Sequence, residues 1–162
     1  MSRKQLKAKL ADLRTLLAGQ FPTTRDLDEW SVAFDWAAGP IPFGCYAEIN
    51  PEMRAIVFRA IWQLPFPPDR RLAVAEYLHR VNYPAPVGGW AIDLDDGDVR
   101  WKSGVYFGDG ELTDELMFEV INSSFALIRL HVMGLVKLSN GAPLPDALEA
   151  VGDDPGEGVI GG

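Results

Sequence analysis

The stretch that decides the fold is Trp90-Ala91-Ile92-Asp93-Leu94-Asp95-Asp96-Gly97-Asp98-Val99-Arg100-Trp101-Lys102-Ser103-Gly104-Val105. On both sides of its centre, apolar side chains alternate with polar or small ones, which is the period-two pattern of a half-buried strand. The Asp96-Gly97 pair between the two runs is typical of a tight hairpin turn. This stretch therefore predicts two antiparallel strands joined by a short acidic turn.

Three apolar runs upstream predict three more strands, at residues 30–36, 43–49 and 54–62. The first run alternates strictly between larger apolar residues and smaller or polar ones. The third run is apolar on both faces, which is typical of a central strand covered on both sides. Breaks at Gly39-Pro40 and Asn50-Pro51 separate the three runs.

Apolar residues at helical spacing indicate three helices. Residues 3–18 place leucines at positions 6, 10, 13 and 17, and Gly19 stands where a C-terminal cap belongs. Residues 69–81 form a second amphipathic segment. Thr113 is a good N-cap for a third helix that runs to about Leu138, and Gly134 marks a position at which that helix can bend or break.

The elements follow the order α-β-β-β-α-β-β-α. This order predicts an α+β fold with an antiparallel five-stranded sheet packed with helices. We expect one domain over residues 1–140, with an N-terminal amphipathic helix at 1–19 and a core at 29–138. Residues 141–162 are acidic and rich in Gly and Pro, so we expect a partly disordered tail with room for a short helix near residues 145–151.

The charge of the chain argues against nucleic acid as its partner. The formal net charge is −8 and the pI is near 4.7, whereas phosphate backbones are held by clustered Lys and Arg. The first helix nevertheless carries the cations Arg3, Lys4, Lys7, Lys9 and Arg14. We interpret them as a solvated helix face rather than as a surface for nucleic acid or an anionic membrane.

We expect a cytoplasmic protein without a membrane span. No stretch of about 20 uninterrupted apolar residues occurs. The most apolar stretch, residues 120–138, contains Arg129 and is interpreted as a buried helix. The N-terminus lacks the apolar run of a secretory signal, and the single Cys45 favours a reducing compartment because it has no partner for an internal disulfide.

No pattern predicts a catalytic residue, a cofactor site or a metal site. The aspartates around Gly97 do not fit the register of an EF-hand loop, so we interpret them as turn residues. His79, His131 and Cys45 lack the close pairing that is typical of zinc ligands. Cys45 is expected in the core, and phosphate-binding loops and nucleophile elbows are not found.

The last helix suggests an interaction surface because its apolar residues surround it on nearly all sides. Either the N-terminal helix and the tail cover its second face, or another chain does. Tryptophan is enriched at interfaces, so the candidate interaction surface combines residues of this helix with two tryptophans. Its members are Trp36, Trp62, Phe125, Leu130 and Met133.

Three pieces of the sequence, between about Tyr46 and Leu138, carry a family resemblance. They are Tyr46-Ala47-Glu48-Ile49-Asn50-Pro51-Glu52, then Pro68-Asp69-Arg70-Arg71 leading to Ala75-Glu76-Tyr77-Leu78 and Val81-Asn82, and then Gly88-Gly89-Trp90-Ala91-Ile92-Asp93-Leu94-Asp95-Asp96-Gly97-Asp98-Val99-Arg100. In combination they resemble the YbjN-like family, described as sensory transduction regulators of bacteria. The resemblance implies a fold like that of type III secretion chaperones, small α+β proteins that often form homodimers, and it supplies no catalytic residues.

We therefore expect a non-enzymatic protein-binding domain that acts as a regulator, adaptor or chaperone and forms a homodimer. The motive is the surplus of apolar surface on the last helix together with five tryptophans. The alternative is a small-molecule sensor or weak enzyme with a pocket between the sheet and the helices, because such pockets are mostly apolar and leave little trace in a sequence.

Overall fold

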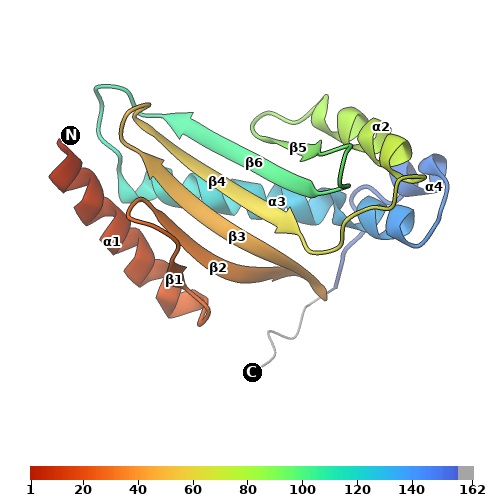
Figure 1. Cartoon of the computed structure of the whole chain (residues 1–162), viewed down its shortest axis with the longest axis horizontal. Coiled ribbons are helices and arrows are strands. Elements are labelled where there is room, and N and C mark those ends of the chain that lie inside the picture. Colours follow the sequence, from red (N-terminus) through yellow and green to blue (C-terminus); the bar gives the residue numbers. More distant parts are fainter. Residues whose placement is uncertain (157–162) are drawn as a thin grey trace.

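The computed structural model describes residues 1–156 and shows an α+β fold built on one antiparallel sheet (Figure 1). The elements are α1 (Arg3–Gln20), β1 (Arg25–Asp26), β2 (Ser31–Ala38), β3 (Ile41–Asn50), β4 (Ala55–Trp62), α2 (Arg71–Asn82), β5 (Gly89–Ile92), β6 (Val99–Tyr106), α3 (Asp114–Ser139) and α4 (Leu144–Glu149). The strand order across the sheet is β1-β2-β3-β4-β6-β5.

The predicted fold class is confirmed, with one correction to the number of strands. The sheet has six strands rather than five, because β1 pairs with β2 at its edge. This strand has two residues, Arg25 and Asp26, which is too short for an alternating pattern to be recognisable. The five predicted strands and their antiparallel hairpins are all present.

One face of the sheet carries the core. The helix α3 runs along this face, α1 flanks it beside β1 and β2, and α2 lies at the other end beside β5 (Figure 1). No described helix crosses the opposite face, so the prediction that β4 is covered on both sides is wrong. There Val57 and Ile61 are only half-buried, and Arg59 bonds Glu48 at 2.9 Å. β-branched residues suit such a half-exposed sheet surface.

The helix ends follow from local chemistry. Ser2 begins α1 with a capping box shared with Gln5, and α1 continues through Gly19 to Gln20, so Gly19 is not the cap. Thr113 caps α3 by accepting a hydrogen bond from the amide of Leu116, as predicted. The helix α2 begins at Arg71, two residues later than expected.

The helix α3 passes Gly134 as one continuous element. A Cβ atom at this position would lie 2.2 Å from the hydroxyl oxygen of Tyr77 on α2, so the glycine allows two helices to approach closely. By length and composition α3 could span a membrane, but Met117, Ile128 and Leu135 are buried in the core below the sheet. The structure thus gives this apolar helix a core role.

The described part of the tail is packed. Ala147 of α4 is fully buried, and α4 contacts α2 and α3. The amide of Gly152 donates a hydrogen bond to the carbonyl of Leu130 at 2.8 Å, and Arg129 lies 3.3 Å from Asp154. The tail of the chain itself therefore covers part of α3. Residues 157–162, which were also expected to belong to the tail, lie outside the described part. The domain boundary at residue 140 stays a prediction.

Candidate functional site

The structure does not expose the five residues of the candidate interaction surface as one patch. Trp36 and Phe125 are in contact, with ring centroids 4.1 Å apart in a stacked arrangement, and both pack partly buried against the core. Met133 is also partly buried. Leu130 lies beside the tail, where 43% of it remains exposed. Trp62 is only 5% exposed and reaches Trp36 through Phe43.

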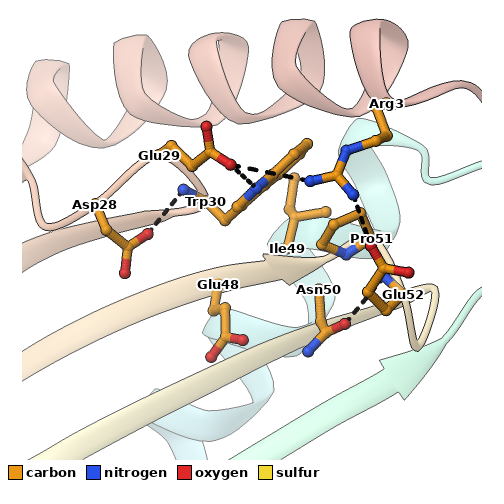
Figure 2. Close-up of a pocket in the computed structure, with 9 residues that line it drawn as sticks. All are labelled: Arg3, Asp28, Glu29, Trp30, Glu48, Ile49, Asn50, Pro51 and Glu52. Atoms are coloured by element: carbon orange, nitrogen blue, oxygen red, sulfur yellow. Dashed lines mark hydrogen bonds and ion pairs between the residues drawn. The ribbon is translucent and has the colours of Figure 1, made fainter.

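A group of charged residues lines a concave surface around Trp30. We call it the Trp30 groove; its volume is about 410 Å³, and it lies between the start of α1, the start of β2 and the β3–β4 turn (Figure 2). Its lining residues are Arg3, Asp28, Glu29, Trp30, Glu48, Ile49, Asn50, Pro51 and Glu52. Aromatic rings flanked by carboxylates can attract cations, so the groove could receive a basic side chain.

Two cations of the chain itself already contact the aromatic ring of the groove. The guanidinium of Arg3 lies 5.2 Å from the centre of the Trp30 ring, and the ammonium of Lys7 lies 5.3 Å from it. Figure 2 shows Arg3 reaching down from α1 toward Glu52, to which it bonds at 2.6 Å. The indole N–H of Trp30 donates to Glu29 at 2.7 Å. A ligand here would have to replace contacts that the protein makes with itself.

Hydrogen bonding favours the ionised form of two carboxylates of the groove, Glu29 and Asp28. The bond from Lys7, and then the one from Trp30, hold the pKa of Glu29 below its ordinary value. The backbone amide of Trp30 lowers the pKa of Asp28, donating to its carboxylate at 2.7 Å. Each acid thus has a donor from within the chain.

A smaller concavity, which we call the Trp62 pocket, lies where the end of β4, the start of β3 and the end of α3 meet. Its volume is about 220 Å³. Its lining residues are Ile41, Pro42, Trp62, Gln63, Leu64, Val136, Ser139 and Asn140. None of them carries a charge, and Leu64 is 65% exposed although it is apolar. The pocket therefore favours an uncharged, largely apolar occupant.

One residue of the pocket lining, Trp62, carries an unpaired polar group. The indole N–H of Trp62 is buried and has no acceptor among the described residues. An unpaired buried donor costs about 1–3 kcal/mol, which an incoming acceptor can recover. The indole N–H of Trp101 is unpaired too, but Trp101 has no exposed surface and lies inside the core. Of the two, only Trp62 lines a pocket.

The surroundings of the buried Cys45 and His131 favour the uncharged form of each side chain. Burial, and then the nearby charge of Asp35, raise the pKa of the Cys45 thiol, which disfavours the thiolate that a nucleophile requires. Burial lowers the pKa of His131 to about 4. Its neutral ring accepts a hydrogen bond from the indole of Trp90 through Nδ1 at 3.2 Å, and its carbonyl accepts one from Tyr77 at 2.6 Å.

The aspartates of the β5–β6 turn bond to the turn itself. Asp93 accepts from the amide of Asp95 at 2.9 Å, and Asp96 accepts from the amide of Asp98 at 2.8 Å. The carboxylate of Asp98 pairs with Arg100. Within residues 1–156, no group of three or more His, Cys, Asp or Glu side chains could hold a metal ion.

Comparison with known proteins identifies the fold. No family model matches the sequence, and no curated protein matches it. The structure is similar to the crystal structure of YbjN from E. coli, a protein with a provisional role as a transcription regulator, with a TM-score of 0.56 and 16% sequence identity. The similarity covers 87% of this chain and 90% of that one. The chain has the YbjN-like fold.

The similarity to YbjN confirms the predicted architecture. The candidate site is argued from the residues of this chain alone. Trp62 is the one candidate interaction residue that lines the Trp62 pocket. Sequence reasoning missed Leu64, two residues after Trp62, and it missed Ile41 and Val136, which come from distant segments. The one signal was Leu64, an apolar residue beside the prolines that follow β4.

Proposed function

We propose that this protein is a non-enzymatic, protein-binding regulator or adaptor whose partner inserts an apolar side chain into the Trp62 pocket. The observation that carries the proposal is the buried, unpaired indole N–H of Trp62 at a pocket beside the exposed Leu64. An apolar side chain in the pocket removes Leu64 from water, and a backbone carbonyl beside it gives the indole an acceptor once the Trp62 ring turns its N–H toward the pocket.

The energetics suit a peptide segment. Burying one Leu- or Phe-sized side chain contributes about 1.5–3 kcal/mol, and interfaces are commonly dominated by a few such anchors, often at tryptophans. A pocket of about 220 Å³ has room for one large side chain. The lack of charge in its lining favours an uncharged anchor.

Other features support a regulator that acts through protein contacts. The net charge of −8 opposes direct binding to phosphate backbones, so regulation through a protein partner fits better than regulation through nucleic acid. The fold is shared with YbjN, whose provisional role is regulatory. The buried thiol of Cys45, which forms no disulfide, suits the bacterial cytoplasm that we propose as its location.

The direct test is site-specific photo-crosslinking in the cells from which the protein comes. A photoreactive amino acid replaces Leu64, and the control replaces Leu72 on α2, which is 75% exposed and does not line the pocket. We expect a discrete protein adduct from position 64 and none from position 72. Trp62→Phe in the same chain should remove most of the adduct, because it deletes the N–H while keeping an aromatic ring. Equal adducts at both positions would contradict the proposal.

A second candidate follows from the same pocket. Its volume is below the roughly 300–1,000 Å³ of sites for drug-sized ligands, so a small apolar molecule with a carbonyl group is the alternative occupant. A ligand that binds only the folded protein raises its melting temperature. A screen of small ketones and esters that raises the melting temperature of the wild type, but not of Trp62→Phe, would favour this sensor over the adaptor.

A further inference from the structure

The open face of the sheet carries three cations on two neighbouring strands. Figure 1 looks onto this face, since the strands lie in front of α3. Arg100 and Lys102 stand two residues apart on β6, so their side chains point to the same side. Arg59 of β4 is the direct partner of Lys102 across the sheet. All three alternate with buried residues and therefore point away from the core. A chain with a net charge of −8 thus gathers three cations on this face.

Two of these cations have acid partners, and the third does not. Arg59 bonds Glu48 at 2.9 Å, and Arg100 pairs with Asp98. Among the described residues, no side chain forms an ion pair with Lys102. Like charges that lie directly opposite each other destabilise a sheet. The pair of Lys102 and Arg59 therefore favours an anion placed between them.

A largely apolar depression adjoins Lys102 on the same face. Its volume is about 330 Å³, and no carboxylate lines it. A Cβ atom at Gly104 would lie 2.7 Å from the backbone oxygen of Ile56, so the close approach of the backbone keeps this place free of a side chain. Tyr106, which is 68% exposed, and Met53, which is 55% exposed, line the depression. An apolar hollow thus lies beside a cation without an acid partner.

We propose that this face binds a segment of a partner protein in which an acidic side chain stands next to an apolar one. The carboxylate lies between Lys102 and Arg59, whose guanidinium uses one nitrogen for Glu48 and keeps further N–H donors. The apolar side chain enters the depression at Gly104 and covers Tyr106. Charge-assisted hydrogen bonds orient the segment, and apolar burial stabilises the complex. We call Arg59, Lys102, Gly104 and Tyr106 the Lys102 site.

The shape and charge of the Lys102 site favour a protein segment over other anions. Sites for small molecules bury about 70–90% of the ligand surface, whereas an open sheet face leaves much of a small ligand in water. Single-stranded nucleic acid can stack on the aromatic residues of a sheet, but it carries a phosphate at every nucleotide. Glu48 and Asp98 lie beside the cations and repel such a chain. A single carboxylate needs only Lys102 and Arg59.

Spectra of the ¹H–¹⁵N type, recorded on the full chain at low ionic strength with two short capped peptides, test the proposal. One peptide carries a phenylalanine next to an aspartate, and its control carries asparagine in place of the aspartate. The first peptide should shift the amide signals of Lys102, Gly104 and Tyr106 in a saturable way, and the control should bind about tenfold more weakly.

Two charge variants show whether the shifts report on the Lys102 site. Lys102→Glu should abolish them. Lys4→Glu changes the net charge by the same amount at an exposed position of α1 and should retain them. Tyr106→Ser should weaken binding by removing the apolar contact. The dispersed spectrum of each variant shows that it folds.

Shifts that Lys102→Glu leaves unchanged overturn the proposal, and so does an aspartate peptide that binds no better than its asparagine control. A single-stranded oligouridylate that shifts the same signals more strongly than the peptide overturns it in favour of nucleic acid. The Lys102 site does not rest on the Trp62 pocket, because Trp62 is buried on the core side at the end of β4. Trp62→Phe should retain the peptide shifts even where it abolishes the photo-adduct at position 64, so that the two proposals fail separately.

Discussion

The Trp30 groove and the Trp62 pocket each place a tryptophan at a concave surface, but they differ in what remains unsatisfied. The groove is almost twice as large, about 410 Å³ against about 220 Å³. Its indole donates to Glu29, and Arg3 and Lys7 cover the Trp30 ring. The pocket has no charge, and its indole lacks an acceptor. Unused hydrogen-bonding capacity and exposed apolar area therefore indicate a binding site better than volume does.

The contacts in the Trp30 groove are nevertheless weak individually. Arg3 and Glu52 have exposed side chains, at 60% and 79%, and ion pairs in such surroundings contribute about 0–1 kcal/mol. A competing cation could replace Arg3, but it would gain little more than Arg3 gives up. The groove is thus accessible to ligands without favouring them.

The largest expected difference between the two regions appears when each tryptophan is truncated. Trp62→Ala should lower the free energy of unfolding by about 3–5 kcal/mol, because it leaves a cavity in the core. Trp30→Ala should lower it by about 1–2 kcal/mol, since the Trp30 ring is only half-buried. Urea unfolding followed by circular dichroism measures both changes. Equal losses would show that the two regions do not differ in packing.

A third tryptophan, Trp90, is buried and has an acceptor for its indole N–H. Trp90 donates to the neutral ring of His131, whose pKa burial lowers to about 4 from an ordinary value near 6.5. The unfolded chain takes up this proton at a higher pH than the folded one does. The contribution of the neutral His131 to the free energy of unfolding is thus fully present above about pH 6.5. It decreases by about 3 kcal/mol as the pH falls to about 4.

Urea unfolding at several pH values measures this effect, with His131→Gln as the control. A glutamine can still accept the indole hydrogen bond but does not titrate. The free energy of unfolding of the wild type should fall more steeply than that of the variant between pH 7 and pH 4. Parallel pH profiles would mean that the folded protein does not lower the pKa of His131 below its value in the unfolded chain.

A smaller effect is expected when only the indole N–H of Trp62 is removed. Trp62→Phe loses ring volume, which destabilises, but it also removes an unpaired buried donor, which stabilises. The two effects should offset each other to within about 1 kcal/mol in urea unfolding. A loss of more than about 2 kcal/mol would indicate that this N–H is satisfied in solution and would weaken the case for the pocket.

The smallest effect is expected for the cation above Trp30. Arg3→Ala removes an exposed ion pair with Glu52 and a cation–π contact with Trp30, together about 1 kcal/mol or less. Since such pairs are screened by salt, the difference from the wild type should shrink in 1 M NaCl. A large change that persists in high salt would show that Arg3 holds α1 in place through packing.

The sequence predicted the architecture through its alternation and its turns. The Asp96-Gly97 turn gave the β5–β6 hairpin, and the alternation of residues 30–36 gave β2. β1 was missed because a two-residue strand has no period. Gly134 was interpreted as a position at which α3 could bend or break. Its role in the close approach to Tyr77 was missed because Tyr77 lies on a helix that is distant in sequence.

The candidate site was predictable only in part. Trp62 and Trp36 could be named because tryptophan is common at interfaces, but alternation alone does not tell which aromatic ring ends at the rim of the core. The Trp62 pocket needs the end of β4, the start of β3 and Val136 of α3 to meet. No local pattern encodes the meeting of three such segments, and the unpaired state of one N–H depends on all of them.

The most direct test of the central claim is the ¹H–¹⁵N spectrum of the five tryptophan indoles, assigned by substitution and recorded with and without the partner captured at position 64. The account predicts that the Trp62 indole signal, without an acceptor in the free protein, shifts downfield when the partner binds, while the Trp30 signal stays in place. A Trp62 signal that does not move, or a Trp30 signal that moves instead, would contradict it.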